Sequence, residues 1–512
     1  MTLRIWSVAW LLPVIWISGC QKKCVPGEGV DCWINALKNP EQVDKAVDNL
    51  RQINDRRAEV ALIEAFQRYS QNPDAEEKII ELLKKWKTKA AVKPMIAALN
   101  FDVGASTADL KIKKANRVNQ RIASCLGEMG EVEAIAPLRR LAQNSQDPNV
   151  QRAAIRGLGN LKAKEAVDDL IRMTEDPNIH KIVRMNAIYA LGEIGDTKAI
   201  EPLVLALYRD KAFFFHQAGL SLEKIGDPAV GLLSSTMEGK NEKVNALLQQ
   251  DADVIEGALE SNAAKVLGDI GSPKAVKPLL ATVEKVAKWN EEVNQMMVLT
   301  RLLNALGAIG DKQGLPPILK NLDTDHPEMR MVCTTAINAI GDRGAMADLL
   351  KVAFADGDPA AKVPVFETIG NLGTDEHLAK LKELSGKQGN EEFLKTAAAD
   401  SLQRLQTYSE CKQEVDCWIG KLKSPQPAVR EKAAYELGRL RDAKASDALI
   451  GVIEDSSESV RFAVGFALEK LKTQKAIAAI EELVEKEKGS ARFKLANFNY
   501  EILAAKLRRA GG

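Results

Sequence analysis

Histidines and aromatic residues are scarce in this sequence of 512 residues, and its net charge is only +1. A nearly neutral chain has no general attraction for nucleic acid or anionic lipid, so we expect no nucleic-acid partner. Strand-like segments between helices are lacking, which argues against an α/β enzyme. The sequence also contains no glycine-rich phosphate loop, nucleophile elbow or metal-spaced His/Asp cluster. It therefore predicts a protein that needs no metal or cofactor and is not an enzyme.

One motif recurs along most of the chain. Its clearest copy runs from Leu191 to Leu203 as Leu-Gly-Glu-Ile-Gly-Asp-Thr-Lys-Ala-Ile-Glu-Pro-Leu. Apolar residues return at helical spacing before Leu191, Gly195 stands where a helix would end, and Asp196 is a candidate N-cap for the next helix. Pro202 fits only in or near the first turn of that second helix. The motif therefore predicts two helices joined by a tight turn.

The spacing of the motif predicts the fold class. Two helices in about 32 residues cannot bury their own apolar faces, but stacked copies bury a continuous core. We therefore expect an all-α fold, an α-solenoid of about 13 helix-turn-helix repeats. The first residue of the motif aligns at Leu50, Leu83, Leu126, Leu158, Leu191, Leu222, Leu267, Leu306, Ile337, Ile369, Leu402, Leu437 and Leu468.

The motif resembles the short bacterial HEAT-like repeats of the PBS-lyase type. Val183-Arg184, then Leu-Gly-x-Ile-Gly-Asp, then Ala-Ile-x-Pro-Leu carry the likeness, which extends over residues 45 to 484. In that family, Asp and Arg of the motif form ladders between neighbouring repeats. The resemblance therefore implies a structural role for Arg184, Arg330, Arg430 and Arg461.

Some proteins with such repeats are enzymes. Deoxyhypusine hydroxylases resemble this repeat and hold two irons with paired His-Glu dipeptides, whereas here none of the four histidines, His180, His216, His326 and His377, precedes a glutamate. Bilin lyases act on cytoplasmic proteins, and HEAT-like DNA glycosylases need a basic, aromatic groove. These comparisons support the expectation that the chain is not an enzyme.

The amino terminus resembles a lipoprotein signal. Arg4 precedes an apolar run from Ile5 to Ile17 that is too short to span a bilayer, and Ile17-Ser-Gly-Cys20 resembles a lipobox. The resemblance implies cleavage before Cys20, lipidation of its sulfur, and an exported protein anchored to a bacterial membrane. Gln21 in place of Asp favours the outer membrane. An ordinary secretory signal and an uncleaved anchor are the alternatives.

Four cysteines form two similar segments. Cys24 and Cys32 flank a Pro-Gly-rich turn, Cys411 and Cys417 flank a short segment, and each second cysteine opens a Cys-Trp-Ile run. Three pairings are possible, and the local pairs Cys24–Cys32 and Cys411–Cys417 need no contact between distant repeats. A metal site is the competing interpretation, although the spacings do not fit a zinc ribbon and an oxidising compartment favours disulfides.

These features predict four segments. Residues 1–19 are a signal peptide, 20–44 a lipidated amino terminus with a disulfide/Trp cap, and 45–407 a repeat array. Residues 408–512 hold a second Cys-Trp module, further repeats and a closing helix that carries Arg508 and Arg509 near its dipole-negative end.

We expect a membrane-tethered scaffold or adaptor that binds another protein in the bacterial cell envelope. Long intervals between repeats often form binding loops, and here they cover residues 100–120, 237–257 and 288–295. The alternative is a carrier or sensor of a small or lipidic ligand held near Phe213 to Phe215 and Trp289, and a HEAT-like enzyme such as a lyase comes third. The candidate partner contacts are Lys111, Lys113, Lys114, Arg117, Arg121 and Trp289.

Overall fold

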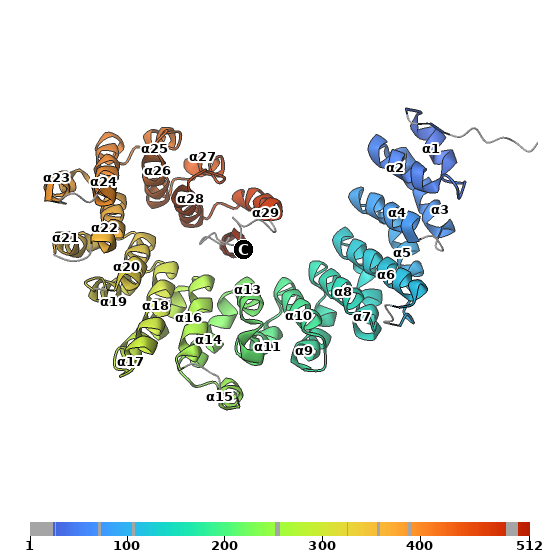
Figure 1. Ribbon diagram of the computed structural model, residues 1–512, viewed down its shortest axis with the longest axis horizontal. Coiled ribbons are helices and arrows are strands. Elements are labelled where there is room, and N and C mark those ends of the chain that lie inside the picture. Colours follow the sequence, from blue (N-terminus) through green and yellow to red (C-terminus); the bar gives the residue numbers. More distant parts are fainter. Residues whose placement is uncertain are drawn as a thin grey trace, which may run out of the picture. The chain divides into compact units, whose positions relative to one another are not determined.

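The computed structural model describes residues 24–487, except 26, 70–72, 105–107, 251–255, 325, 356–358 and 388–391, and residues 500–511 (Figure 1). All regular secondary structure in this part of the chain is helical, which confirms the predicted all-α solenoid. None of the described helices combines the length and apolar composition that crossing a membrane requires. The predicted signal peptide and Cys20 lie outside the described residues.

The chain forms two compact units, unit 1 (residues 1–157) and unit 2 (residues 158–512), and their boundary falls within helix α8. The segment boundaries predicted from the sequence stay predictions. The described α-helices that begin in unit 1 are α1 (Val30–Ala36), α2 (Val43–Ile53), α3 (Glu59–Arg68), α4 (Pro73–Lys85), α5 (Val92–Ala98), α6 (Leu110–Met129), α7 (Ile135–Asn144) and α8 (Pro148–Asn160).

Unit 2 continues the same alternation of helices. Its described α-helices are α9 (Val167–Glu175), α10 (Lys181–Ile194), α11 (Ile200–Ala206), α12 (Arg209–Ala212), α13 (Phe215–Ile225), α14 (Val230–Met237), α15 (Glu242–Gln249), α16 (Ala258–Ile270), α17 (Val276–Val286), α18 (Glu292–Ile309), α19 (Leu315–Lys320), α20 (Pro327–Ile340), α21 (Met346–Phe354), α22 (Pro359–Leu372), α23 (Leu378–Lys387), α24 (Glu392–Cys411), α25 (Val415–Lys421), α26 (Pro427–Leu440), α27 (Ser446–Ile450), α28 (Glu458–Leu471), α29 (Ala476–Glu487) and α31 (Tyr500–Gly511).

The aligned motif positions define the first helix of each repeat, which we call the A helix. All of these positions except Leu402 are buried, so they form the core of the stack. The A helices are α2, α4, α6, α8, α10, α13, α16, α18, α20, α22, α24, α26 and α28.

The turn of the motif behaves as its residues predict. Gly195 ends α10 with φ 73°, a left-handed conformation that glycine adopts without strain. The Asp196 side chain then accepts a hydrogen bond of 2.9 Å from the backbone nitrogen of Lys198. It caps a short 3-10 turn, and α11 begins only at Ile200, which leaves Pro202 in the first turn of that helix.

The glycine that follows the motif leucine allows neighbouring A helices to approach closely. A Cβ atom placed on Gly268 would lie 2.8 Å from the Cα of Ala305, and one on Gly438 would lie 2.9 Å from the Cα of Ala467. A side chain at either position would push two helices of adjacent repeats apart.

Arginines of the motif bind backbone and carboxylate oxygens outside their own helix. The Nε of buried Arg184 donates to the carbonyl oxygen of Thr174 at 3.2 Å, and its Nη2 lies 2.8 Å from an Asp210 carboxylate oxygen. Arg430 binds both carboxylate oxygens of Asp455, at 2.7 and 2.8 Å, and thus joins neighbouring repeats. These contacts support the structural role that the family resemblance implies.

Candidate interaction surfaces

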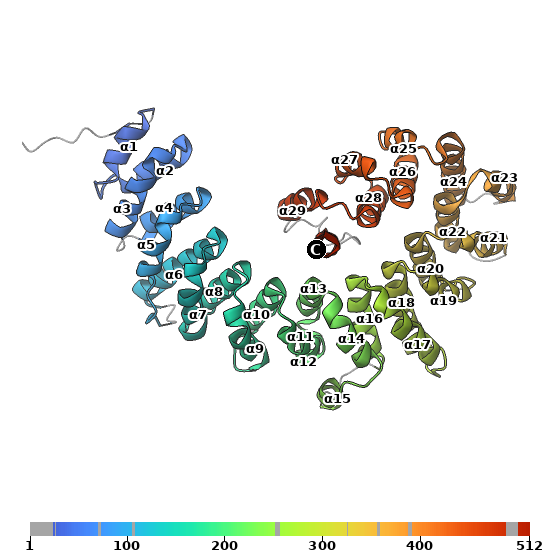
Figure 2. The same ribbon diagram turned by 180° about the vertical axis from the view of Figure 1, so that it is seen from behind.

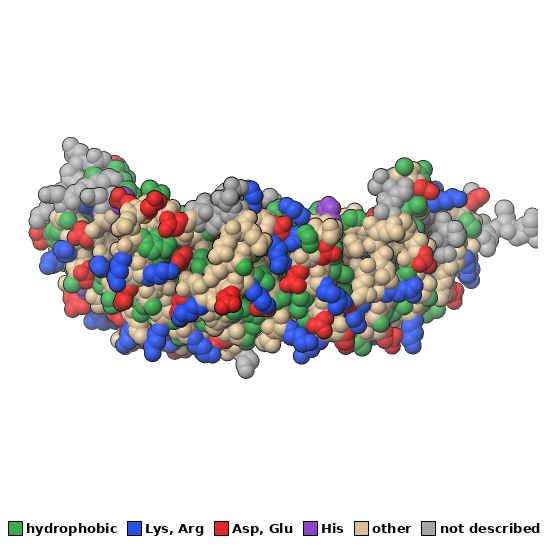
Figure 3. All heavy atoms as spheres, turned by 90° about the horizontal axis from the view of Figure 1, so that it is seen from below, with side chains coloured by type: hydrophobic (Ala, Val, Ile, Leu, Met, Phe, Trp, Pro, Cys, Tyr) green, Lys and Arg blue, Asp and Glu red, His purple; other side chains and the backbone are tan. Residues whose placement is uncertain are grey.

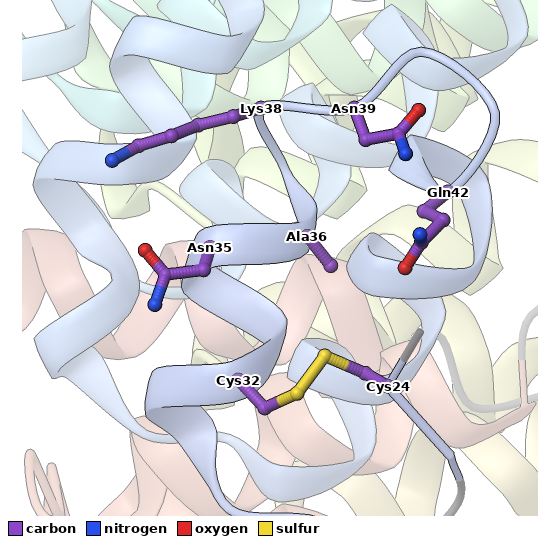
Figure 4. A pocket seen from close by; sticks show the side chains of 7 residues that line it. All are labelled: Cys24, Cys32, Asn35, Ala36, Lys38, Asn39 and Gln42. Carbon is purple, nitrogen blue, oxygen red and sulfur yellow. A yellow bond between two sulfur atoms is a disulfide. The ribbon is translucent and has the colours of Figure 1, made fainter. Parts of the chain in front are cut away.

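The first cysteine pair closes the turn before α1. Cys24 and Cys32 are joined in a disulfide with their Cα atoms 6.0 Å apart. Figure 4 shows Asn35, Lys38 and Gln42 around the open pocket beside this bond. The sulfurs lie near Glu28, but because they are bonded to each other they cannot act as thiolate ligands for a metal.

The second cysteine pair lies within a repeat. Cys411 ends α24, Cys417 lies in α25, and their disulfide spans a Cα–Cα distance of 5.4 Å. Trp418 is fully buried, and its Nε1 donates to the carbonyl oxygen of Lys412 at 2.9 Å. Helix α24 continues through residues 406–411. The disulfide-linked segment from Cys411 to Cys417 therefore forms the turn between α24 and α25, the two helices of one repeat.

The predicted basic contacts lie on α6, and two of them are paired with acids of the preceding repeat. Arg117 contacts Asp74 and Glu77 on α4, and Arg121 lies 3.9 Å from a carboxylate oxygen of Glu81 on the same helix. These arginines are therefore part of a charge ladder across the A helices of unit 1. The other three predicted contacts, Lys111, Lys113 and Lys114, are exposed on the first turns of α6.

The predicted aromatic contact, Trp289, is half-buried between α17 and α18. Its ring lies beside Gly257 and Val298, and its carbonyl oxygen accepts a hydrogen bond of 3.0 Å from the Gln295 side chain. Phe213 is half exposed with Lys181 above its ring, at 4.8 Å from the centroid, whereas Phe214 is buried. These contacts give each aromatic side chain a packing role.

The C-terminal helix contacts repeats nearly 300 positions earlier in the chain. One guanidinium nitrogen of Arg509 lies 2.8 Å from the carboxylate of Glu223 on α13 and also donates to the Glu223 carbonyl oxygen. The other terminal nitrogen donates to the carbonyl oxygen of Ile270, at the end of α16, at 3.0 Å. Figures 1 and 2 both show the C terminus beside α13.

A row of cations continues this contact along unit 2. Successive A helices from α13 to α20 end in glycines with positive φ, and each glycine lies beside a basic side chain from α26, α28 or α31. Such an end carries unpaired carbonyl oxygens and the negative end of the helix dipole, so a cation stabilises it. The pairs are Gly226 with Arg509, Gly271 with Lys506, Gly310 with Lys470, and Gly341 with Arg439.

A buried ionic cluster anchors the row at α22 and α26. The Glu436 carboxylate lies 2.8 Å from Lys432 Nζ, 2.9 Å from Arg439 Nη1 and 3.2 Å from Arg343 Nη2. Lys432, which is fully buried, also donates to the carbonyl oxygens of Asn371 and Gly373, at 2.7 and 3.2 Å.

Burial and charge set the protonation of this cluster. Burial lowers the pKa of Lys432 to about 7, although Glu436 opposes the shift. For Glu436, burial raises the pKa, but Lys432, Arg439 and Arg343 outweigh it and leave the pKa below its ordinary value. Burial also raises the pKa of Glu223 to about 7, against the lowering effect of Arg509.

Charges of both signs are mixed on the face of the molecule shown in Figure 3. This distribution agrees with the net charge of +1 and with the ion pairs between repeats.

The four histidines occupy separate repeats and have local contacts. His180 caps α10 by accepting a hydrogen bond from the Ile182 nitrogen at 3.2 Å, and His377 completes a capping box before α23. His326 is exposed, and His216 lines a small pocket on α13. Within the described residues, no group of His, Cys, Asp or Glu besides the cysteine turn is close enough to share a metal.

Comparisons with known proteins identify the repeats. Residues 142–223 and 416–496 match the HEAT repeats, and residues 298–324 match the PBS lyase HEAT-like repeat. Deoxyhypusine hydroxylase-B of rice, Oryza sativa subsp. japonica, is 28% identical over 242 residues, which cover 44% of this chain and 78% of that protein.

Three solved structures align with this chain at low sequence identity. The human deoxyhypusine hydroxylase structure has 18% identity, a TM-score of 0.23, and coverage of 54% of this chain and 95% of that chain. The phycocyanin lyase complex from Nostoc has 18% identity, a TM-score of 0.29, and coverage of 47% and 93%. The Kap95:Nup1 complex has 13% identity, a TM-score of 0.45, and coverage of 95% and 73%.

The rice relative contradicts the prediction that this chain is not an enzyme, because that relative is an enzyme by name. The physical reason is that a repeat sequence records how helices pack, and catalytic and non-catalytic solenoids share that packing. A missing motif was therefore no ground for excluding catalysis. The comparisons do establish the type of repeat, since both HEAT repeats and a PBS lyase HEAT-like repeat are found in this chain.

Proposed function

We propose that this protein is a HEAT-repeat scaffold that binds another protein in the bacterial cell envelope and is tethered to a membrane through Cys20. Stacked repeats present an extended surface on which a partner can lie. The lipobox resemblance at Ile17 to Cys20 supports the tether and export. A lipid anchor would keep such a surface close to a membrane.

The observation that carries the proposal is an open helix end in unit 1. Gly130 ends α6 with φ 81°, and among the described residues no atom lies within 4 Å of the position where its Cβ would stand. In unit 2, Gly226, Gly271, Gly310 and Gly341 occupy the same place in the motif and lie beside lysine or arginine side chains, whereas Gly195 is as open as Gly130. The end of α6 therefore has the chemistry of a cation-binding site.

Two acidic side chains flank this helix end. Glu128 is about half exposed and lies 3.3 Å from Lys84, and Glu131 lies 2.9 Å from the exposed Lys89. Exposed ion pairs of this kind contribute little stability, so a partner can replace them at small cost. The expected partner surface presents lysine or arginine side chains from a helix or loop.

Site-specific photo-crosslinking in the producing cells tests this surface. We expect a crosslinker at position 128 to capture a specific protein band, whereas one at Gln143, which is exposed on α7 of the same repeat, does not. The Glu128→Lys variant should lose the partner because it reverses the charge at the helix end. Identical bands from positions 128 and 143 would refute the proposed surface.

A separate experiment tests the tether. Mass spectrometry of the protein from its native membrane fraction should find a peptide that begins at Cys20 and carries acyl chains. The Cys20→Ser variant should leave the membrane fraction. An unprocessed amino terminus, or a Cys20→Ser variant that stays with the membrane, would refute lipid tethering while leaving the protein-binding proposal open.

A further inference from the structure

The C-terminal repeats have an apolar core of their own. Buried residues from Tyr408 to Leu507 form one cluster, to which α31 contributes Tyr500, Leu503 and Leu507. The apolar face of α31 is thus covered by α28 and α29. Since burial of apolar surface is the main stabilising contribution in a solenoid, α31 is an integral part of the C-terminal stack.

Charged side chains of α28 and α31 make the hydrogen bonds and close approaches to the ends of α13, α16 and α18. Arg509 binds Glu223 and the carbonyl oxygens at the ends of α13 and α16. Lys506 lies beside Gly271, and it is held at 3.2 Å from a carboxylate oxygen of Glu469 on α28. Lys470 lies beside Gly310 in the same way.

These contacts differ in kind from those between neighbouring repeats. Adjacent A helices bury motif leucines against one another, whereas the cation row uses single charged side chains at helix ends. A cation at a helix C terminus adds only a small stabilisation, and salt weakens it. The pairs of Arg509 with Gly226, Lys506 with Gly271 and Lys470 with Gly310 can therefore separate while both stacks keep their cores.

We propose that the C-terminal repeats, α26 to α31, form a releasable clasp that occupies the C-terminal ends of α13, α16 and α18 through Arg509, Lys506 and Lys470. The stack remains attached through α24, which packs beside α26 as a neighbouring repeat. Opening the clasp exposes a row of helix ends together with Glu223. That row accepts basic side chains of a partner, so the clasp is an intramolecular competitor for it.

The inference goes beyond the proposed binding surface in unit 1, because every contact that carries it lies within unit 2. A failure of the crosslinking experiment at position 128 would leave the clasp unaffected, and the reverse also holds.

Hydrogen exchange of the full-length protein tests the clasp. The double variant Arg509→Ala with Lys506→Ala removes both cations of α31 that contact α13 and α16. Its matched control is Arg508→Ala, because Arg508 is on the same turn of α31 but pairs with Glu481 on α29. We expect exchange at residues 226–229 and 271–275 to be about tenfold faster in the double variant and unchanged in the control. Small-angle scattering should show a larger maximum dimension for the double variant only.

A second measurement separates opening from unfolding. Wild-type protein moved from low salt to about 1 M NaCl should show the same local increase in exchange, because the screening length falls to about 3 Å. The core of α16 to α20 should remain protected in every sample. Equal exchange in the double variant, the control and wild type would overturn the clasp, and so would loss of protection throughout unit 2 in both the double variant and wild type at high salt.

Discussion

Replacing Glu436 by glutamine tests how unit 2 holds its buried charges. The Glu436 side chain is nearly inaccessible to solvent, and Lys432, Arg439 and Arg343 all lie within 3.2 Å of its carboxylate. Glutamine keeps the size of the side chain but removes the only negative charge that these three contacts share. The variant therefore leaves cations facing one another in a site that water does not reach.

The structure gives the expected magnitudes. Removing one partner of a buried ion pair costs about 3–5 kcal/mol of unfolding free energy, because the remaining charge is left uncompensated. Replacing Lys432 by methionine is milder, because Arg439 and Arg343 still neutralise Glu436 and burial already disfavours the lysine charge. Lys432→Met should cost about 1–2 kcal/mol, largely for the hydrogen bonds to Asn371 and Gly373.

Urea denaturation of the full-length variants, followed by far-UV circular dichroism, measures these free energies. The variant that combines Glu436→Gln with Lys432→Met should be more stable than Glu436→Gln alone, since removing the lysine relieves the repulsion between the buried cations. The reasoning is refuted if Lys432→Met destabilises as much as Glu436→Gln, or if the two losses simply add.

Three further predictions concern other contacts. The folded-state pKa of Glu223 is raised from 4.5 to about 7, so protonation of Glu223 stabilises the folded state. This contribution to the unfolding free energy is complete below about pH 4.5 and is lost as the pH rises through 7. Relative to Glu223→Gln, the wild type should lose up to about 3 kcal/mol between pH 4.5 and 8 in denaturation measurements, and a gain would contradict the shift. Replacing Cys411 and Cys417 by serine opens a short loop and should cost about 2 kcal/mol in the same assay, whereas an unchanged value would argue that the bond is absent in solution. Arg117→Ala should cost less than about 1 kcal/mol, because Arg117 and its partner Asp74 are exposed, and a larger loss would mean that the ladder on α6 is cooperative.

The repeat architecture could be predicted because it depends on the spacing of residues that are close together in the sequence. In the clearest copies of the motif, leucine marks the buried face of the A helix, glycine ends the helix, and aspartate starts the next turn, so the sequence of one repeat predicts its two helices. Leu191, Gly195 and Asp196 occupy the predicted places. The turn around Trp418 was harder to predict from the sequence. The motif is interrupted there, although α24 continues as a helix.

The contacts within unit 2 could not be predicted from spacing, because they join residues far apart in the sequence. Periodicity describes only how each repeat meets its neighbours, whereas Arg509 meets Glu223 at a separation of 286 positions. The basic residues involved also look like ordinary solvated charges of a helical protein. Sequence reasoning consequently placed Arg509 at the end of its own helix, where it does lie, and missed the two helix ends that it binds.

A signal for the clasp was nevertheless present in departures from the motif. Glutamate replaces the glycine after the motif leucine at Glu223 and Glu469, and these two carboxylates bind Arg509 and Lys506 of α31. The position before the leucine holds alanine at Ala190, Ala305, Ala336 and Ala467, whereas it holds Glu436 in α26.

A buried charge at a position that most repeats fill with a small or apolar residue costs stability unless another part of the chain pairs with it. In this protein the partners of Glu223 and Glu436 include residues outside the neighbouring repeats, at Arg509 and Arg343. In a solenoid, a charge that breaks the packing rule of its own repeat therefore indicates a contact that the repeat cannot supply. The same criterion can be applied to other solenoid sequences before a structure is known, by asking which misplaced acids have a distant basic partner.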